Sequence, residues 1–183
     1  MSELLDKTYR DQLVSWIGRP CHFRLLYKII RDGCSAPTFH QKCDGQGPTV
    51  PVLYNTNNTI CGGYLSQSWN SNAAKIYDTR AFLFRLQNNG LYNPIKFPCK
   101  LLATAGYGDN NYGPTFIGGP DIFTFNGTII KSGNCFPLNG SVSELGHSYN
   151  LNGQIISSIT NSSLQVTDLE VFKVEGGSRV RFS

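Results

Sequence analysis

The segment from Cys21 to Leu86 constrains the fold most, because it predicts a strand, a short helix and then two paired strands. Apolar runs at residues 25–30, 50–54 and 60–65 are the strand candidates. Residues 55–59 read Asn-Thr-Asn-Asn-Thr, and Asn tolerates positive φ and closes turns with its side chain, so the second and third runs should form a hairpin. The first run needs a partner from elsewhere in the chain.

The rest of the chain adds many further short runs. Glycine-rich and asparagine-rich segments separate them, which is typical of a chain with frequent turns. About nine or ten strand candidates against two clear helices predict a mostly β fold with flanking helices, a two-layer antiparallel β-sandwich with a single core. The later candidates are residues 81–86, which are apolar on both faces and suit a central strand, then 95–97, 101–105, 121–125, 128–130 and 163–174.

Two helices are predicted. Apolar residues spaced by threes and fours over residues 3–17 indicate an amphipathic helix, with Ser2 as a possible cap and Gly18 at its end. We expect it to cover a sheet, which divides the chain into an N-terminal helix at 1–19 and a β domain at 20–183. A shorter helix over residues 36–43 should begin at Ser35, since proline is tolerated in a first helical turn.

Several loops and turns carry residues of interest. Residues 66–77 should form a loop that folds Trp69 onto the body, and residues 107–119 should form a long loop, which in compact domains is often functional. Its aromatic residues, Tyr107, Tyr112 and Phe116, could either contact a partner or plug the end of the sandwich. Gly62-Gly63 indicates close approach of a backbone or a ring, or a bulge, and Asn126-Gly127 predicts a hairpin.

Acidic residues fall in places that need an explanation. Asp168 and Glu170 lie in the middle of the last strand candidate, so this strand should be bent or bulged, with its carboxylates at an edge or bound to backbone donors. The carboxylates of Asp32, Asp44, Asp109, Asp121 and Glu170 could gather for acid/base chemistry or a cation, but aspartate before glycine is more often a turn residue. Gly118-Gly119 could hold an anion on backbone amides or allow a turn.

Charge and cysteine content narrow the classes of protein. The net charge is +4, but the sequence has no run of Lys and Arg residues. It therefore lacks the basic cluster that is typical of nucleic-acid-binding proteins. The six cysteines are not densely spaced and no signal peptide opens the sequence, which favours reduced thiols and a cytoplasmic location. No apolar run reaches the length of a transmembrane helix.

The region around Cys34, His40 and Cys43 is the one candidate for nucleophilic catalysis or metal binding. Cys34 and Cys43 with His40 could serve a thiol-based antioxidant or a hydrolase, although no nucleophile elbow surrounds either cysteine. A zinc site from the same residues with Cys21 and His22 would lack the close Cys-x-x-Cys pair that structural zinc sites use. The sequence therefore predicts no metal and no cofactor. A cysteine of this kind is usually buried and packs as a small hydrophobic residue.

A set of short motifs, taken in order, resembles the TLDc domain from about residue 20 to 175. The motifs are Leu25-Leu26-Tyr27, Asp32-Gly33, Phe39-His40-x-Lys42-Cys43-Asp44, Gly47-Pro48-Thr49-Val50, Gly62-Gly63-Tyr64 with Ser68-Trp69, Ala81-Phe82-Leu83-Phe84, Gly113-Pro114-x-Phe116-x-Gly118-Gly119-x-Asp121 and Leu169-Glu170-Val171-Phe172. The resemblance implies a β-sandwich, protection from oxidative stress, and binding to the vacuolar proton pump (V-ATPase), with no catalytic constellation.

Within that family, residues 46–50 and 170–176 look most like interferon-induced protein 44-like proteins, which implies a role in innate defence. Those proteins continue into a GTPase-like domain, but no Gly-x-x-x-x-Gly-Lys-Ser/Thr loop occurs in this sequence, so GTP binding is not carried over.

The sequence therefore predicts a non-catalytic, monomeric protein-interaction domain, with a thiol enzyme using Cys34, His40 and Cys43 as the alternative. The candidate binding residues are Asp32, Gly33, Trp69, Tyr112, Phe116, Gly118, Gly119, Asp121 and Glu170.

Overall fold

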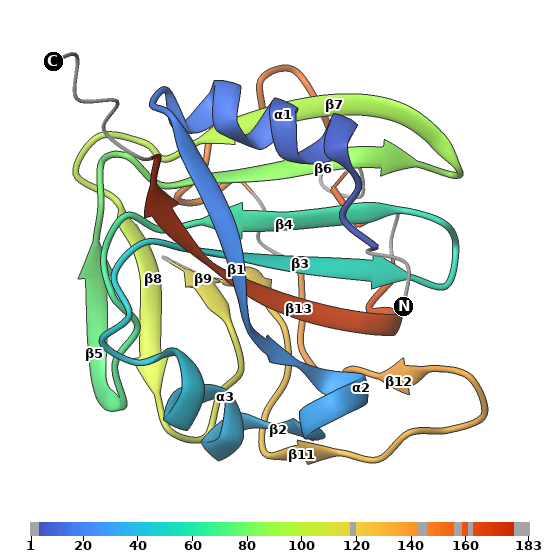
Figure 1. The fold of residues 1–183 in the computed structure, drawn as a ribbon. Coiled ribbons are helices and arrows are strands. Elements are labelled where there is room, and N and C mark those ends of the chain that lie inside the picture. Colours follow the sequence, from blue (N-terminus) through green and yellow to red (C-terminus); the bar gives the residue numbers. More distant parts are fainter. Residues whose placement is uncertain (1–3, 118–119, 143–145, 156–158, 161–162, 178–183) are drawn as a thin grey trace, which may run out of the picture.

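The fold is built on one large antiparallel sheet (Figure 1). A computed structural model describes residues 4–117, 120–142, 146–155, 159–160 and 163–177. Across the sheet the strands follow the order β1 (Cys21–Lys28), β13 (Gln165–Gly176), β3 (Thr49–Asn55), β4 (Ile60–Tyr64), β6 (Phe82–Asn88) and β7 (Leu91–Pro98), with β12 (Phe136–Pro137) beside β13. The first predicted strand thus finds its partner in β13, at the far end of the sequence.

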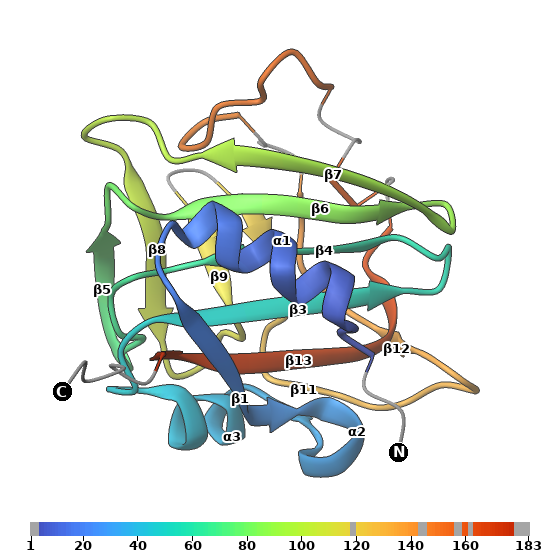
Figure 2. The same ribbon diagram turned by 45° about the horizontal axis from the view of Figure 1, so that its top comes forward.

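Three two-stranded sheets lie with the main sheet in the described part of the chain. They pair β5 (Asn72–Tyr77) with β8 (Thr104–Asp109), β9 (Thr115–Ile117) with β10 (Pro120–Phe123), and β2 (Cys34–Ser35) with β11 (Thr128–Ile129). In Figures 1 and 2, β8 and β9 lie on the face of the main sheet opposite to α1 (Lys7–Ile17). The prediction of a mostly β, antiparallel fold is confirmed, although the second layer is assembled from small pieces.

Side chains on the two faces of the main sheet form two separate hydrophobic clusters, so the expected single core is wrong. Successive residues of a strand point to opposite faces, and in β3 Val52 joins the cluster under α1 while Leu53 joins the other. Because both faces are covered, every residue of β3 is buried. The central position predicted for residues 81–86 is also confirmed, since β6 lies between β4 and β7.

The N-terminal helix is shorter than predicted. It begins after Asp6, whose side chain accepts a hydrogen bond from the Tyr9 backbone at 3.1 Å, so Asp6 is the N-cap. Ser2, the predicted cap, lies outside the described residues. The helix ends at Gly18 as expected, in the left-handed conformation with φ +80°. Trp16 packs on Phe82 and Phe84 of β6, which fastens α1 to the sheet.

Two short helices follow β1. The strand stops at Lys28, and residues 29 and 30 belong to α2 (Ile29–Asp32), so the predicted run 25–30 extends too far. The helix α3 (Ala36–Cys43) has the predicted limits, but Ser35 makes no capping hydrogen bond with its side chain. Both helices lie at one edge of the fold, beside β1 (Figure 2).

The predicted turns had mixed outcomes. The hairpin of β3 and β4 is confirmed, and a Cβ on Gly63 would lie 2.4 Å from the Phe116 ring, so close approach explains this glycine. The hairpin predicted around Asn126-Gly127 is wrong, because β11 pairs with β2.

Two predicted loops contain strands. The predicted loop 66–77 contains β5, and the predicted loop 107–119 overlaps β8 and β9. Leu101 and Leu102, expected in a strand, lie in an exposed turn.

Candidate functional site

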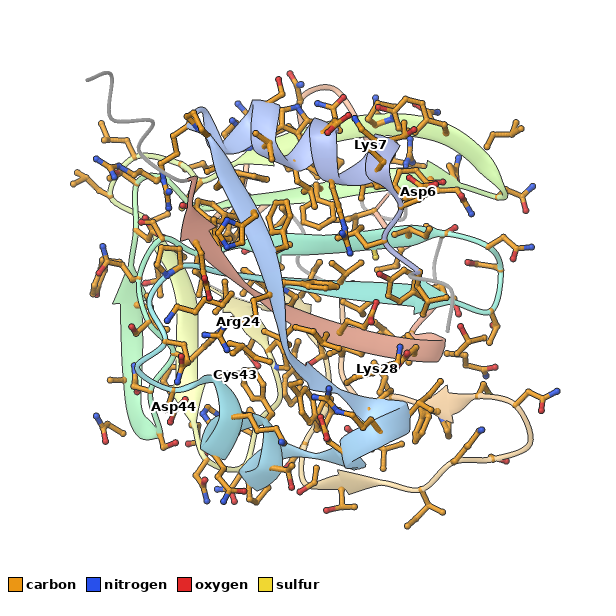
Figure 3. All side chains as sticks on the ribbon, viewed as in Figure 1. Asp6, Lys7, Arg24, Lys28, Cys43 and Asp44 are labelled. Carbon is orange, nitrogen blue, oxygen red and sulfur yellow. The ribbon has the colours of Figure 1, made fainter. Side chains whose placement is uncertain are left out.

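The acidic residues of the last strand belong to a buried charged cluster, which we call the Lys28 cluster: Lys28, Asp168 and Glu170. The Lys28 ammonium donates to the Asp168 carboxylate and, at 3.1 Å, to that of Glu170, and the Asp168 side chain is only 1% exposed. Figure 3 shows Lys28 where β1 enters α2. The predicted bulge is present beside Val166, but the edge position is wrong, since β13 lies between β1 and β3.

Burial and ion pairing act in opposite directions within the Lys28 cluster. Burial raises the pKa of Asp168, and the ion pair with Lys28 only partly offsets this effect. The backbone N–H of Leu169 also donates to Asp168 at 2.9 Å, as expected for a carboxylate bound by backbone donors. The ion pairs of Lys28 with the two carboxylates thus connect the end of β1 to β13.

Asp32 lies next to this cluster, at the end of α2. It accepts hydrogen bonds from the Lys28 backbone at 3.0 Å and from the Arg31 guanidinium at 2.9 Å. Burial works to raise the pKa of Asp32, but these donors outweigh it and the pKa is lowered. Gly33 follows with φ +85°, which explains the glycine as a turn residue.

The candidate aromatic residues lie inside the molecule. Trp69 and Phe116 are fully buried and meet edge to face, with ring centroids 5.6 Å apart. Of the two roles considered for the loop aromatics, Phe116 therefore has the filling role. Tyr112 is half-buried and packs on Phe123 with a centroid distance of 4.9 Å. The Trp69 and Phe116 rings therefore reach a partner only if the surrounding structure opens, whereas Tyr112 is partly accessible.

Asp121 is buried and holds a neighbouring loop. Its carboxylate accepts from the backbone N–H groups of Gly146 at 2.8 Å and Ser148 at 2.9 Å. Burial raises its pKa, while these two donors act in the opposite direction. Gly118 and Gly119 lie outside the described residues. The candidate residues that the structure describes are spread over several regions and do not converge on one site. Trp69 contacts Phe116, and Asp32, Gly33 and Glu170 lie around Lys28.

His40 does not contact the thiols that the alternative hypothesis would pair with it. Its Nδ1 lies 2.6 Å from an Asp44 carboxylate oxygen, and its Nε2 donates to the Tyr112 backbone carbonyl at 2.9 Å. Figure 3 shows Asp44 directly after Cys43, at the end of α3. The Nδ1 contact therefore lies within the end of α3, where Asp44 is the C-cap, while the Nε2 contact fastens α3 to the segment before β9. Among the described residues no group of three or more His, Cys, Asp or Glu side chains could hold a metal ion.

The buried cysteines should react slowly with alkylating reagents. Burial raises the pKa of Cys34 and of Cys61 to about 12, and raises that of Cys43 strongly. Since the thiolate is the nucleophile, iodoacetamide at pH 7.5 should modify these three cysteines at least about 100-fold more slowly in native protein than in guanidinium chloride. Mass spectrometry of the peptides measures this. Rapid modification of Cys34 or Cys43 in the native protein would support the thiol mechanism instead.

A surface cleft that the sequence did not indicate is the stronger candidate site. We call it the Arg80 cleft, with a volume of about 560 Å³, and it is lined by Ser66, Gln67, Tyr77, Asp78, Thr79, Arg80, Leu102 and Ala103. The segments between β5 and β6 and between β7 and β8 form its walls, and both lie at the same end of the molecule (Figures 1 and 2).

The floor of the Arg80 cleft is rigid. Asp78 is buried, and its carboxylate accepts from the Ser66 backbone at 2.5 Å, from the Ser66 hydroxyl at 2.6 Å and from the Arg80 backbone at 3.0 Å. These bonds hold the loop that presents Thr79 and Arg80, which lowers the cost of ordering this loop when a ligand binds.

Large apolar side chains stand exposed around the cleft. Tyr77 is 63% exposed, Leu101 81% and Leu102 89%. Leu102 also has φ +63°, a conformation that costs energy for a leucine. A strained turn that displays two leucines is unfavourable in water, which is the property expected of a surface that another molecule covers.

The fold and the site define a class: a β domain with a preformed, apolar-rimmed surface cleft that fits a binding function. A sequence model of the TLDc domain matches residues 1–175, so the chain belongs to the TLDc family. Among the described residues no helix is long and apolar enough to cross a membrane.

Curated relatives share part of this chain. "TBC1 domain family member 24" of Xenopus tropicalis is 31% identical over 124 residues, which cover 60% of this chain and 22% of the relative. "MTOR-associated protein MEAK7" of Danio rerio is 34% identical over 67 residues, covering 37% of this chain and 15% of the relative. The chain thus spans about a fifth or less of their lengths. These relatives support the TLDc family and not the interferon-induced subgroup.

Proposed function

We propose that this TLDc domain is a non-catalytic protein-interaction module that binds its partner through the Arg80 cleft. The observation that carries the proposal is the exposure of Tyr77 and Leu102 in the lining of the cleft, with the exposed Leu101 next to Leu102 in the chain. Burial of large apolar side chains at the centre of an interface supplies most of the binding energy in protein complexes. Tyr77 and Leu102 both line the cleft, so one partner can contact both.

The partner that the TLDc resemblance implies is the vacuolar proton pump, and the proposal takes it as the first to test. Protection from oxidative stress would then follow from this interaction and not from chemistry on the domain. The buried cysteines agree with this view, since burial raises the pKa of the Cys34 and Cys43 thiols. The proposal places the domain in the cytoplasm as a monomer, with no cofactor.

Substituting Leu102 by asparagine should weaken binding to the assembled pump by about tenfold or more, because it removes an exposed apolar anchor. Asparagine accepts positive φ more readily than leucine, so the stability of the fold should be unchanged or slightly higher. Biolayer interferometry on the purified, assembled pump measures binding, and the melting temperature reports folding.

A matched control is Ile130→Asn, which removes another exposed apolar side chain, 78% exposed, far from the residues of the cleft. Its affinity should stay within about twofold of the wild-type value. Equal binding by Leu102→Asn and the wild-type protein would show that the cleft is not the contact. Absence of wild-type binding at micromolar concentration would remove the pump as the partner.

A further inference from the structure

A second hollow adjoins the Arg80 cleft, and we call it the basic pocket. It has a volume of about 420 Å³ and lies between the end of α1, the end of β4, the segment before β6 and the end of β7. It is lined by Trp16, Ile17, Gly18, Arg19, Tyr64, Thr79, Arg80, Ala81, Lys96 and Pro98. Thr79 and Arg80 line both hollows, so one ligand can occupy the two together.

Three cations and no acidic side chain line the basic pocket within the described part of the chain: Arg19, Arg80 and Lys96. Lys96 is held in place, since its ammonium donates to the Trp16 carbonyl at 3.2 Å and lies 4.8 Å from the Phe82 ring centroid. Among the same described residues neither arginine forms a salt bridge. The lining of the pocket therefore carries three positive charges. The nearest described carboxylate, Asp78, lies in the adjoining Arg80 cleft, where backbone N–H groups and the Ser66 hydroxyl bind it.

The apolar walls of the pocket strengthen the attraction between its cations and an anionic ligand. Tyr64 is buried, and burial raises the pKa of its hydroxyl, while the nearby Arg19 charge acts against that rise. Trp16 and Ile17 contribute apolar surface on the α1 side. Charges next to low-dielectric walls interact more strongly than charges in open water. Arginine in particular binds carboxylates through two parallel N–H···O bonds.

We propose that the basic pocket binds an acidic side chain of the partner, and that the same peptide segment places an apolar side chain in the Arg80 cleft. This inference rests on the proposed function and specifies the partner: a short segment in which Asp or Glu stands close to an apolar residue. The charge complementarity and the shared Arg80 favour one peptide across both hollows. A small pocket beside an apolar rim fits one acidic side chain of a peptide better than it fits an extended anionic surface such as a membrane.

Phage display of random dodecapeptides against the full chain provides the probe. Selected peptides should be enriched in Asp and Glu next to an apolar residue, and their affinity should fall as NaCl rises. Fluorescence anisotropy with the best selected peptide should give at least about tenfold weaker binding for Arg80→Gln and for Arg19→Gln. Both side chains are exposed, so the variants should fold with an unchanged melting temperature.

The control is Lys131→Gln, which removes an exposed cation outside the pocket and should leave the affinity within twofold. Peptides without acidic residues, or peptides that bind Arg80→Gln as tightly as wild type, would overturn the inference. If Leu102→Asn still weakens those peptides, the proposed function survives while the acidic specificity does not. Co-sedimentation with phosphatidylserine vesicles that depends on Arg19 and Arg80, without peptide selection, would also overturn it and indicate a membrane surface.

Discussion

Substituting Lys28 by methionine is expected to lower the free energy of unfolding by about 3–5 kcal/mol, because the change leaves two buried carboxylates without a counter-charge. The Lys28 side chain is only 10% exposed, and its partners Asp168 and Glu170 are buried on β13. Urea denaturation followed by circular dichroism measures the loss. The same change should loosen the end of β1, since these contacts join β1 to β13.

The loss should depend on pH. Burial already raises the pKa of Asp168, and without Lys28 the opposing ion pair is gone, so the pKa rises further. A pKa that is higher in the folded than in the unfolded state means that the folded protein binds more protons, so its stability decreases as pH rises through that range. The difference between Lys28→Met and wild type should therefore be small near pH 4 and grow towards pH 7.

Lys42→Met is the matched control. Its ammonium lies 3.7 Å from Asp32, but its side chain is 38% exposed, and ion pairs at such positions contribute about 0–1 kcal/mol. If Lys28→Met were as stable as Lys42→Met at pH 7, the buried cluster would not stabilise the sheet. A triple variant that also carries Asp168→Asn and Glu170→Gln should recover part of the stability, because no uncompensated charge remains.

Local sequence patterns predicted the elements that local interactions stabilise. The helix α3 was predicted with its limits, and the hairpin of β3 and β4 follows from its asparagine-rich turn. The unusual position of Asp168 and Glu170 in a strand was also recognised, because charges at buried strand positions need partners. Lys28, the partner itself, was missed because it is 140 residues away from Asp168 in the sequence.

Strands that depend on distant partners could not be predicted. The strands β5 and β8 lie in segments rich in Asn, Gly and Ala, which disfavour strands on their own, yet they pair along their length. The strand β11 was expected to pair with the segment just before it in a hairpin. It pairs instead with β2, which lies some ninety residues earlier in the sequence. Such pairings follow from the overall packing and leave no local signal.

The candidate site was missed for the same reason. The Arg80 cleft combines three segments, around Ser66, Arg80 and Leu102, and none of them carries a motif. The best available signal was the Leu101-Leu102 pair beside Lys100, which the sequence analysis assigned to a strand. The prediction that Trp69 folds onto the body is confirmed, and core filling was one of the two roles considered for Phe116. Both were also chosen as binding residues, but their rings are buried.

Substituting Trp69 by alanine should lower the free energy of unfolding by about 3–5 kcal/mol, the usual cost of removing a buried aromatic side chain. The Trp69 ring meets Phe39 and Phe116 edge to face, with both centroid distances at 5.6 Å. Its indole N–H also donates to the buried Thr49 hydroxyl at 2.8 Å. Trp69→Phe should cost less, about 1–3 kcal/mol, since it keeps a ring but leaves that hydroxyl without its donor.

Tyr77→Ala is the contrasting variant, because Tyr77 is an exposed aromatic residue at the Arg80 cleft. Its stability should stay within about 0.5 kcal/mol of wild type, while its binding to the partner should weaken. Trp69→Ala should bind normally at temperatures where it remains folded, as judged by circular dichroism. If folded Trp69→Ala lost binding and Tyr77→Ala did not, the binding surface would lie over the core around Trp69 and not at the cleft.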